Sequence, residues 1–275
     1  MILKYESSNG NIFDLKAVPL RARTADFHDY SWTPQAVRLQ YGDKLTRFDK
    51  PSATYRMKLD VSGTLDERKK ALNRLHEAFD YDVWHQTPGK ILHGDYYING
   101  FVTMSKTGYH EPYTENEITI YCPNPFWVKE SVYKFKQHEP VPQMYLDFPH
   151  RYAYDYYSEL ASDTVINVSS VIDADFRIRF YYFYHPMSVK VLLDGIWRYI
   201  GISGLDAYDV IEFDSASKTI FLYQDGEKIN IFDKRAKGSV SVFTPLKPGL
   251  VPVSWDRQFD FDLTIYERRS EPPWI

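Results

Sequence analysis

The sequence has almost no cysteine and no long apolar run. Cys122 is the only cysteine in 275 residues, so an internal disulfide cannot form. This composition fits folding in a reducing cytoplasm. No apolar run approaches the roughly 20 residues that span a bilayer, and residues 1–6 lack the basic start and apolar core of a signal peptide. We therefore expect neither membrane insertion nor a secretory leader.

An excess of charge of one sign is also missing. The net charge is −4, and basic and acidic residues are interspersed rather than grouped in blocks. A protein that binds nucleic acid through its phosphates normally carries a basic stripe or patch. The charge pattern therefore argues against nucleic acid as the main partner.

Local catalytic and metal-binding motifs are absent from the sequence. It contains no GxGxxG, GxxxxGK or GxSxG motif. The nearest pair of histidines, His85 and His93, lacks the spacing that places two imidazoles on one metal. Cys122 lies beside two prolines, which is more typical of a structural thiol than of a nucleophile. We expect no enzyme, no cofactor and no metal site.

Paired carboxylates leave one enzymatic alternative open, because the two acids of a glycosidase need not be close in sequence. This alternative requires two carboxylates that face each other across a cleft. The candidates are Asp80, Asp82, Asp95, Asp173 and Asp175.

Aromatic residues are what the sequence has in abundance, at 17% with 23 tyrosines, which favours strands and interaction surfaces. Trp197 and Tyr199 alternate on one face of a strand that follows Asp194–Gly195. We interpret this face as core; the alternative is that Trp197 stacks on a sugar ring, in a carbohydrate-binding adhesion module. Residues 181–184 are aromatic on both faces of their strand, which favours an assembly interface.

The N-terminal half is predicted to be strands with one helix. Asn9–Gly10 between apolar runs predicts a hairpin, residues 36–41 and 55–61 read as strands, and the polar residues 21–33 read as a loop. Thr64 and Glu67 have the spacing of a capping box, so a helix is expected at about residues 64–80. Its apolar face is predicted to be Ala71, Leu72, Leu75, Ala78 and Phe79, with Arg68, Lys69, Lys70, Arg74 and Glu77 opposite.

The C-terminal half is predicted to contain strands only. Phe176–Phe180 and Phe259–Ile265 alternate with period two, and Asp194–Gly195 and residues 215–218 separate pairs of strands as hairpin turns. This pattern is typical of an antiparallel β-sandwich. We therefore expect a mainly β protein with two domains, at residues 1–135 and 136–275.

The segment Ile118–Trp127 is predicted to mark the junction between these domains. It begins as an alternating strand and meets two prolines, which lack the amide hydrogen needed to continue a ladder. Large apolar side chains follow at once. We expect an anchor of the domain junction made of Cys122, Pro123, Asn124, Pro125, Phe126 and Trp127.

Several short motifs resemble the distal tail proteins of long, non-contractile-tailed bacteriophages. The N-terminal resemblance covers about residues 1–130: the early hairpin, the helix preceded by Thr64, and a strand with a Cys–Pro–x–Pro–Phe–aromatic ending at Tyr121–Trp127. In the C-terminal half, Tyr208–Asp214 resembles a family strand that ends in Asp, and Phe243–Trp255 resembles the family's segment before the last strand. Leu250–Pro252 and Asn167–Ser169 depart from the family pattern.

The resemblance implies a structural hub at the phage tail tip. Such proteins form a hexameric ring from a domain similar to the β-barrel of the tail tube protein, with a galectin-like sandwich outside the ring. The ring joins the tube to the tail-tip or tail-associated lysin protein, can support receptor-binding proteins, and lets DNA pass without specific binding. The resemblance also implies that the protein is located in the tail tip of the virion and is assembled in the cytoplasm of the host bacterium.

Overall fold

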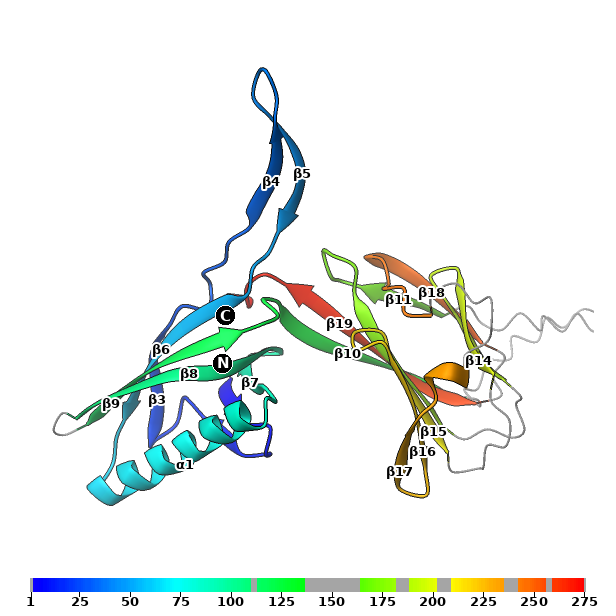
Figure 1. Ribbon diagram of the computed structural model, residues 1–275. Coiled ribbons are helices and arrows are strands. Elements are labelled where there is room, and N and C mark those ends of the chain that lie inside the picture. The colour runs from blue at the N-terminus through cyan, green and yellow to red at the C-terminus, as the bar shows by residue number, and fades with distance from the viewer. Residues whose placement is uncertain are drawn as a thin grey trace, which may run out of the picture. The chain divides into compact units, whose positions relative to one another are not determined.

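A computed structural model describes residues 2–109, 113–136, 164–181, 188–201, 209–234, 242–255 and 259–274. The chain divides into two compact units (Figure 1). Unit 1 contains Met1–Lys129 and Arg269–Ile275, and unit 2 contains Glu130–Arg268. The sequence predicted two contiguous domains divided at residue 135. In the structure the first unit instead ends at Lys129 and also includes the last residues of the chain, from Arg269.

Unit 1 consists of antiparallel strands that share one long strand, β8. The first half of β8 pairs with β7 and its second half with β9, and a bulge between Val102 and Met104 lies in the second half. One series runs β2-β1-β7-β8-β10 and the other β8-β9-β6-β3. Among the described strands β2 and β3 do not pair, so no closed barrel forms. The bounds are β1 Leu3–Glu6, β2 Ile12–Asp14, β3 Leu20–Ala25, β6 Ala53–Val61, β7 Gly89–His93, β8 Tyr96–Tyr109, β9 Thr114–Cys122 and β10 Trp127–Phe135.

The helix of unit 1, α1, runs from Leu65 to Trp84, longer than expected. It begins with the predicted capping box between Thr64 and Glu67. Apolar side chains from its inner face join those of the strands in one core, which accounts for its position against the sheet (Figure 1). The helix residues in this core are Leu75, Ala78 and Phe79, with Ala71 and Leu72 partly buried against it.

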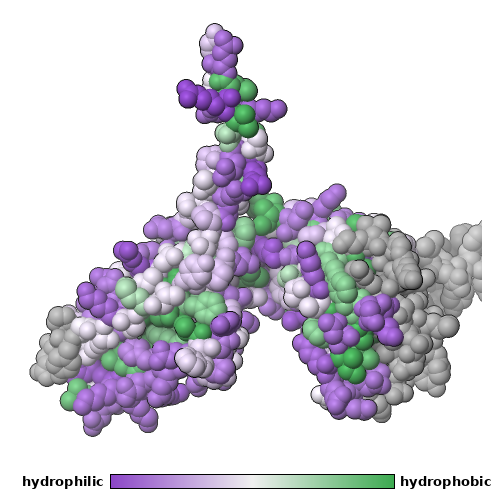
Figure 2. Space-filling view, viewed as in Figure 1, coloured by the Kyte–Doolittle hydropathy of each residue, from purple (hydrophilic) through white to green (hydrophobic). Residues whose placement is uncertain are grey.

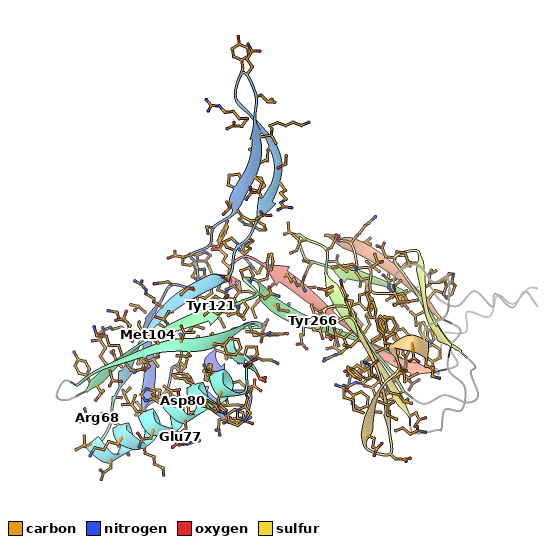
Figure 3. All side chains as sticks on the ribbon, in the orientation of Figure 1. Arg68, Glu77, Asp80, Met104, Tyr121 and Tyr266 are labelled. Atoms are coloured by element: carbon orange, nitrogen blue, oxygen red, sulfur yellow. The ribbon has the colours of Figure 1, made fainter. Side chains whose placement is uncertain are left out.

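Arg68 was expected on the polar face of α1, and this prediction is wrong. The side chain is buried, and its Nη1 donates a hydrogen bond to Thr114 Oγ1 at 3.3 Å. Burial of the guanidinium is tolerated because strand β9 supplies a hydroxyl acceptor. Figure 3 shows Arg68 near the start of the helix, with Glu77 and Asp80 further along it.

The segment 21–33, expected to be a loop, contains strand β3. Leu20–Ala25 pairs antiparallel with β6, from Leu20 opposite Val61 to Ala25 opposite Met57. Arg23 turns outward and forms ion pairs with Asp60 and Glu115, at 3.5 and 2.7 Å. An edge strand with a charged outer face has little apolar periodicity, which explains why the sequence pattern missed it.

Unit 2 is an antiparallel β-sandwich. One sheet has the order β17-β16-β15-β12-β19 and continues to β10, whose residues from Glu130 onward belong to unit 2. The other sheet has the order β11-β18-β13-β14. Apolar side chains from both sheets meet in one core, including Phe176, Phe213 and Phe261 from the first sheet and Val191 and Val253 from the second. The bounds are β11 Thr164–Val168, β12 Asp175–Tyr181, β13 Ser188–Leu193, β14 Ile196–Gly201, β15 Val210–Asp214, β16 Thr219–Gln224, β17 Glu227–Asn230, β18 Gly249–Trp255 and β19 Asp260–Arg269, with a 3₁₀ turn at Phe232–Lys234.

The prediction of a mainly β fold with one helix near the start is confirmed in the described residues. The hairpins at Asn9–Gly10, Asp194–Gly195 and residues 215–218 are also confirmed. Residues 182–184 of the aromatic run and the side chain of Tyr199 lie outside what the structure describes. No helix in the described part of the chain is long and apolar enough to cross a membrane.

Candidate assembly site

A two-stranded hairpin projects from unit 1 (Figure 1). Strand β4, Thr33–Arg38, pairs antiparallel with β5, Asp43–Asp49, and the pair joins no other strand described in the structure. Gly42 takes φ +76° in the connecting turn, a conformation that favours glycine. The sequence predicted a strand at residues 36–41 but not its partner β5 or its projection.

The hairpin exposes apolar side chains to solvent. Figure 2 shows hydrophobic residues interspersed with hydrophilic ones along it. An isolated two-stranded hairpin is marginal in water, and exposed apolar groups of this kind mark interaction surfaces. The hairpin is therefore the strongest candidate for an assembly surface in the described part of the chain. Its exposed large apolar residues are Val37, Leu39, Tyr41, Leu45 and Phe48, each 51% to 87% exposed.

A lysine surrounded by aromatic rings forms the base of the hairpin. Lys50, which follows β5, places its Nζ 4.9 Å from the ring centre of Tyr30, 5.1 Å from Trp32 and 5.4 Å from Phe126. These cation–π contacts are electrostatic attractions to the ring faces. Tyr30 and Trp32 precede β4, so both ends of the hairpin meet Phe126 of the turn between β9 and β10.

That turn is the segment predicted as the junction anchor. Pro123 and Asn124 are exposed, whereas Pro125 is buried and Phe126 is partly buried. Asn124 Oδ1 accepts a hydrogen bond from the Phe126 amide at 3.3 Å, as in an Asx turn. The prolines end β9 at Cys122, and β10 starts at Trp127.

Cys122 lies fully buried in the core of unit 1. Burial raises the pKa of its thiol to about 12, because the thiolate would be desolvated. A Cβ on Gly100 of β8 would lie 2.8 Å from Cys122 Sγ, so the two strands approach too closely for a larger residue. The thiol thus fills space beside a glycine rather than facing a substrate.

Trp127 is also fully buried, and its neighbours are aromatic. Its ring centre lies 5.3 Å from Phe27, 6.1 Å from His93 and 6.2 Å from Tyr55. Strand β10 then crosses from unit 1 to unit 2 between Lys129 and Glu130. The predicted anchor residue Trp127 therefore belongs to the core of unit 1 at the point where the chain leaves it.

Trp197 was interpreted as a core residue of unit 2, and this interpretation is wrong. Its side chain is 46% exposed, whereas its neighbour Arg198 is 2% exposed. Arg198 Nη1 donates to the Leu193 carbonyl and, at 3.2 Å, to the Ile196 carbonyl, and Nη2 donates to Thr244 at 2.8 Å. Backbone acceptors thus hold the guanidinium inside and turn Trp197 outward.

Two of the five candidate carboxylates, Asp82 and Asp175, are engaged in structural contacts, whereas Asp80, Asp95 and Asp173 are exposed. Asp82, at the end of α1, is buried and accepts hydrogen bonds from Tyr5, Ser7 and Ser8. Asp175 accepts from Ser215 Oγ at 3.1 Å and pairs with Arg268. These contacts connect elements that are far apart in sequence, so the two acids stabilise the fold.

His93 and His85 have separate places in unit 1. His93 lies in β7, is buried, and contacts the Phe27 and Trp127 rings edge to face. His85 follows α1 and lies 2.9 Å from the Tyr81 carbonyl through Nδ1. In the residues that the structure describes, no group of three potential metal ligands comes together.

Comparison of the fold with solved structures gives full-length matches. The structure of "SPP1 Dit (gp 19.1) Protein, a Paradigm of Hub Adsorption Apparatus in Gram-positive Infecting Phages" has a TM-score of 0.62 at 12% identity, over 98% of this chain and 100% of that one. A chain of the phage P2 baseplate in its activated conformation with Ca has a TM-score of 0.65 at 11% identity, over 99% and 100%. The same baseplate with Sr gives 0.64 at 12%, over 99% and 100%.

At the level of sequence, no family model and no curated protein matches. The likeness is therefore carried by the arrangement of strands and the helix over the whole chain. The chain has the fold of the distal tail (Dit) and baseplate proteins of bacteriophages, as the short sequence motifs predicted.

Proposed function

We propose that this protein is a structural hub of a phage tail tip. The observation that carries the proposal is the full-length likeness in fold to a Dit protein described as a paradigm of the hub adsorption apparatus. The hub joins the tail tube to the tail-tip or tail-associated lysin protein and supports host-adsorption components, which include receptor-binding proteins. It is a virion component, assembled in the host cytoplasm, and it works by binding rather than by catalysis.

Unit 1 forms a ring of six copies in this proposal, and the hairpin β4–β5 is the arm that contacts the neighbouring copy. The support is physical: no other strand that the structure describes pairs with the hairpin edges, and the hairpin exposes apolar side chains, of which Phe48 is 54% exposed. Association with a second copy would bury these groups. DNA passes through the ring without specific binding, which is compatible with the net charge of −4.

Binding to the tube and tip proteins of the same phage tests the hub role. The purified chain is mixed with each protein, and complexes are separated by size and imaged by negative stain. The proposal expects rings that bind a tube end on one face and the tip protein on the other. Absence of binding to both proteins would contradict it.

A second function, carbohydrate binding in host adhesion, is favoured by the exposure of Trp197 alone. An exposed indole can stack on a sugar ring. Trp197→Ala should then remove binding to host cell-wall polysaccharide, while Trp84→Ala, at an 86% exposed residue of unit 1, should leave it unchanged. Equal binding by the two variants would reject this function.

A further inference from the structure

The turn between β1 and β2 contains one of the two Asn–Gly dipeptides of the sequence, Asn9–Gly10. The other, Asn99–Gly100, lies within β8. In such a dipeptide the backbone nitrogen of the glycine can reach the side-chain amide carbon of the asparagine, because glycine has no Cβ to obstruct the approach. The two dipeptides lie in opposite surroundings, and the hub role assigns nothing to either.

The surroundings of Asn9–Gly10 leave the glycine nitrogen accessible. Both residues are exposed, and a Cβ on Gly10, whose φ is +86°, would meet no atom within 4 Å. Two backbone hydrogen bonds close the turn, from the Ser7 amide to the Asn11 carbonyl and from the Gly10 amide to the Ser7 carbonyl, each at 2.9 Å. A short exposed turn opens locally without unfolding of the whole unit. The Gly10 amide is thereby released to solvent.

The side chain of Asn9 is folded toward the residues that follow it. Its Oδ1 accepts a hydrogen bond from the Asn11 amide at 3.0 Å, as in an Asx turn. The ring that this contact closes contains both Asn9 Cγ and the Gly10 nitrogen, so the two atoms are kept on the same side of the turn. A donor on Oδ1 also stabilises the negative charge that this oxygen gains when Cγ is attacked.

We propose that Asn9 is the site of a spontaneous covalent modification, conversion to aspartate and isoaspartate through a succinimide. The Gly10 nitrogen loses its proton to solvent base and forms a bond to Asn9 Cγ, with the charge passing to Oδ1. The carbonyl re-forms, the Cγ–Nδ2 bond breaks, and Nδ2 takes up protons and leaves as ammonia. Water then opens the ring at one of its two carbonyls, so no oxidant or reductant takes part. The inference concerns one turn of unit 1 and is independent of the hub role.

The second dipeptide should stay intact in the folded protein. Asn99 lies opposite Lys90 and Gly100 opposite Gly89 in the ladder between β7 and β8. Gly100 is buried, and a Cβ on it would lie 2.8 Å from Cys122 Sγ. Closure of the succinimide ring requires the backbone to rotate out of this ladder, so Asn99 reacts only when the core of unit 1 opens.

Isoaspartate at position 9 should weaken the attachment of β1 to α1. The preceding residue, Ser8, donates hydrogen bonds from its amide and its hydroxyl to Asp82 Oδ1, at 2.8 and 2.6 Å. Isoaspartate adds a methylene to the backbone directly after Ser8, whereas aspartate adds the same negative charge without lengthening the chain. The isoaspartyl form, purified by ion exchange, should therefore unfold at a lower urea concentration than Asn9→Asp. Equal midpoints would overturn the assigned link between the turn and α1.

Peptide mapping of the full chain by mass spectrometry tests the site. Folded protein is kept at neutral and at mildly alkaline pH and sampled over weeks. Asn9 should be converted at least about tenfold faster than Asn99, since opening an exposed turn costs less than opening a core strand. Conversion should be faster at the higher pH, because the Gly10 nitrogen must lose a proton. In guanidinium chloride both dipeptides should react at similar rates. Equal rates at Asn9 and Asn99 in the folded protein overturn the proposal.

Two variants identify the reacting atoms. Asn9→Gln keeps a side-chain amide but places its carbon one methylene further from the attacking nitrogen, so conversion at position 9 should fall to the level of Asn99. Asn73→Gln, at an exposed asparagine of α1, is the matched control and should leave conversion of Asn9 unchanged. Folding of both is checked by circular dichroism. Acidic species that form in Asn9→Gln as fast as in wild type would place the reaction elsewhere and reject the site.

Discussion

The ammonium nitrogen of Lys50 lies 5.4 Å from the centre of the Phe126 ring. This contact joins the end of the projecting hairpin to the turn between β9 and β10. The adjacent residue, Trp127, lies in the core of unit 1. The turn predicted as a junction anchor thus also supports the base of the candidate assembly arm, so changes in the turn should affect both stability and assembly.

Trp127→Ala should destabilise unit 1 by about 3–5 kcal/mol, since it removes a large side chain from a closely packed core. Urea unfolding followed by circular dichroism measures the loss, and negative-stain imaging measures the accompanying impairment of assembly. Val132→Ala is the control, because Val132 lies in the same strand β10 and is 53% exposed. A Trp127→Ala protein as stable as Val132→Ala, with normal assembly, would refute the anchor role.

Cys122 should be unreactive in the folded protein. Its pKa of about 12 leaves very little thiolate at pH 8, and the side chain is fully buried. A colorimetric thiol reagent should modify it only after unfolding by guanidinium. Ser217→Cys, which adds a thiol at an exposed turn, should react at once under native conditions. Rapid native labelling of Cys122 itself would show that this part of the core opens readily.

Glu67→Gln should lower the stability of unit 1 near neutral pH only. Hydrogen bonds from the Thr64 amide and hydroxyl, at 2.8 and 2.9 Å, lower the pKa of Glu67 from its usual 4.5. A depressed pKa contributes stability above 4.5 that is lost as pH falls through the folded-state value. Melting temperatures of wild type and variant should differ at about pH 7 and converge at about pH 2.

Glu77→Gln, on the exposed middle of α1, is the matched control for Glu67→Gln and should not reproduce this pattern. A difference between wild type and Glu67→Gln that stays constant from neutral to acid pH would contradict the assigned role of the capping box.

Arg198→Met should destabilise unit 2 by about 2 kcal/mol, as buried carbonyls lose a charged donor while the apolar volume is kept. The loss is partly offset because burial of the charge is itself unfavourable, which lowers the pKa of Arg198 to about 10. Chemical denaturation provides the measurement. Lys247→Met, which removes an exposed cation from the segment before β18, should change stability by less than about 0.5 kcal/mol. Equal effects of the two substitutions would contradict the structural role of Arg198.

Elements could be predicted from the sequence where the residue pattern of a segment matches the burial of its side chains in the structure. Strand β6 alternates between buried Tyr55, Met57, Leu59 and Val61 and more exposed residues, so its period is visible. The Thr64–Glu67 capping box and the Asn–Gly hairpin are likewise local signals. Such signals involve residues close together in sequence, so the helix or strand that they specify can be predicted without knowledge of tertiary contacts.

Features that depend on distant partners were not predictable. Arg198 points inward because the backbone carbonyls of Leu193 and Thr244 accept hydrogen bonds from its guanidinium. The alternation of residues in β14 gives no indication of these acceptors. Trp274, near the end of the chain, stacks on His28 with ring centres 3.8 Å apart, a long-range contact without a local pattern. The hairpin β4–β5 lacks a buried face, so its sequence shows no clean period. At the candidate assembly site, the sequence identified Phe126 and Trp127 but not Lys50.

The hairpin as the arm of a ring is the central claim, and the mass of the assembly tests it most directly. Mass photometry of the full chain should give a species of six times the monomer mass. The double variant Leu45→Ser/Phe48→Ser should remain folded and monomeric, because it removes exposed apolar groups of the hairpin without touching either core. Trp84→Ser/Leu250→Ser, which changes exposed apolar residues elsewhere, should assemble as wild type does. A wild-type chain that stays monomeric at high concentration, or hairpin variants that still form six-copy species, would contradict the account.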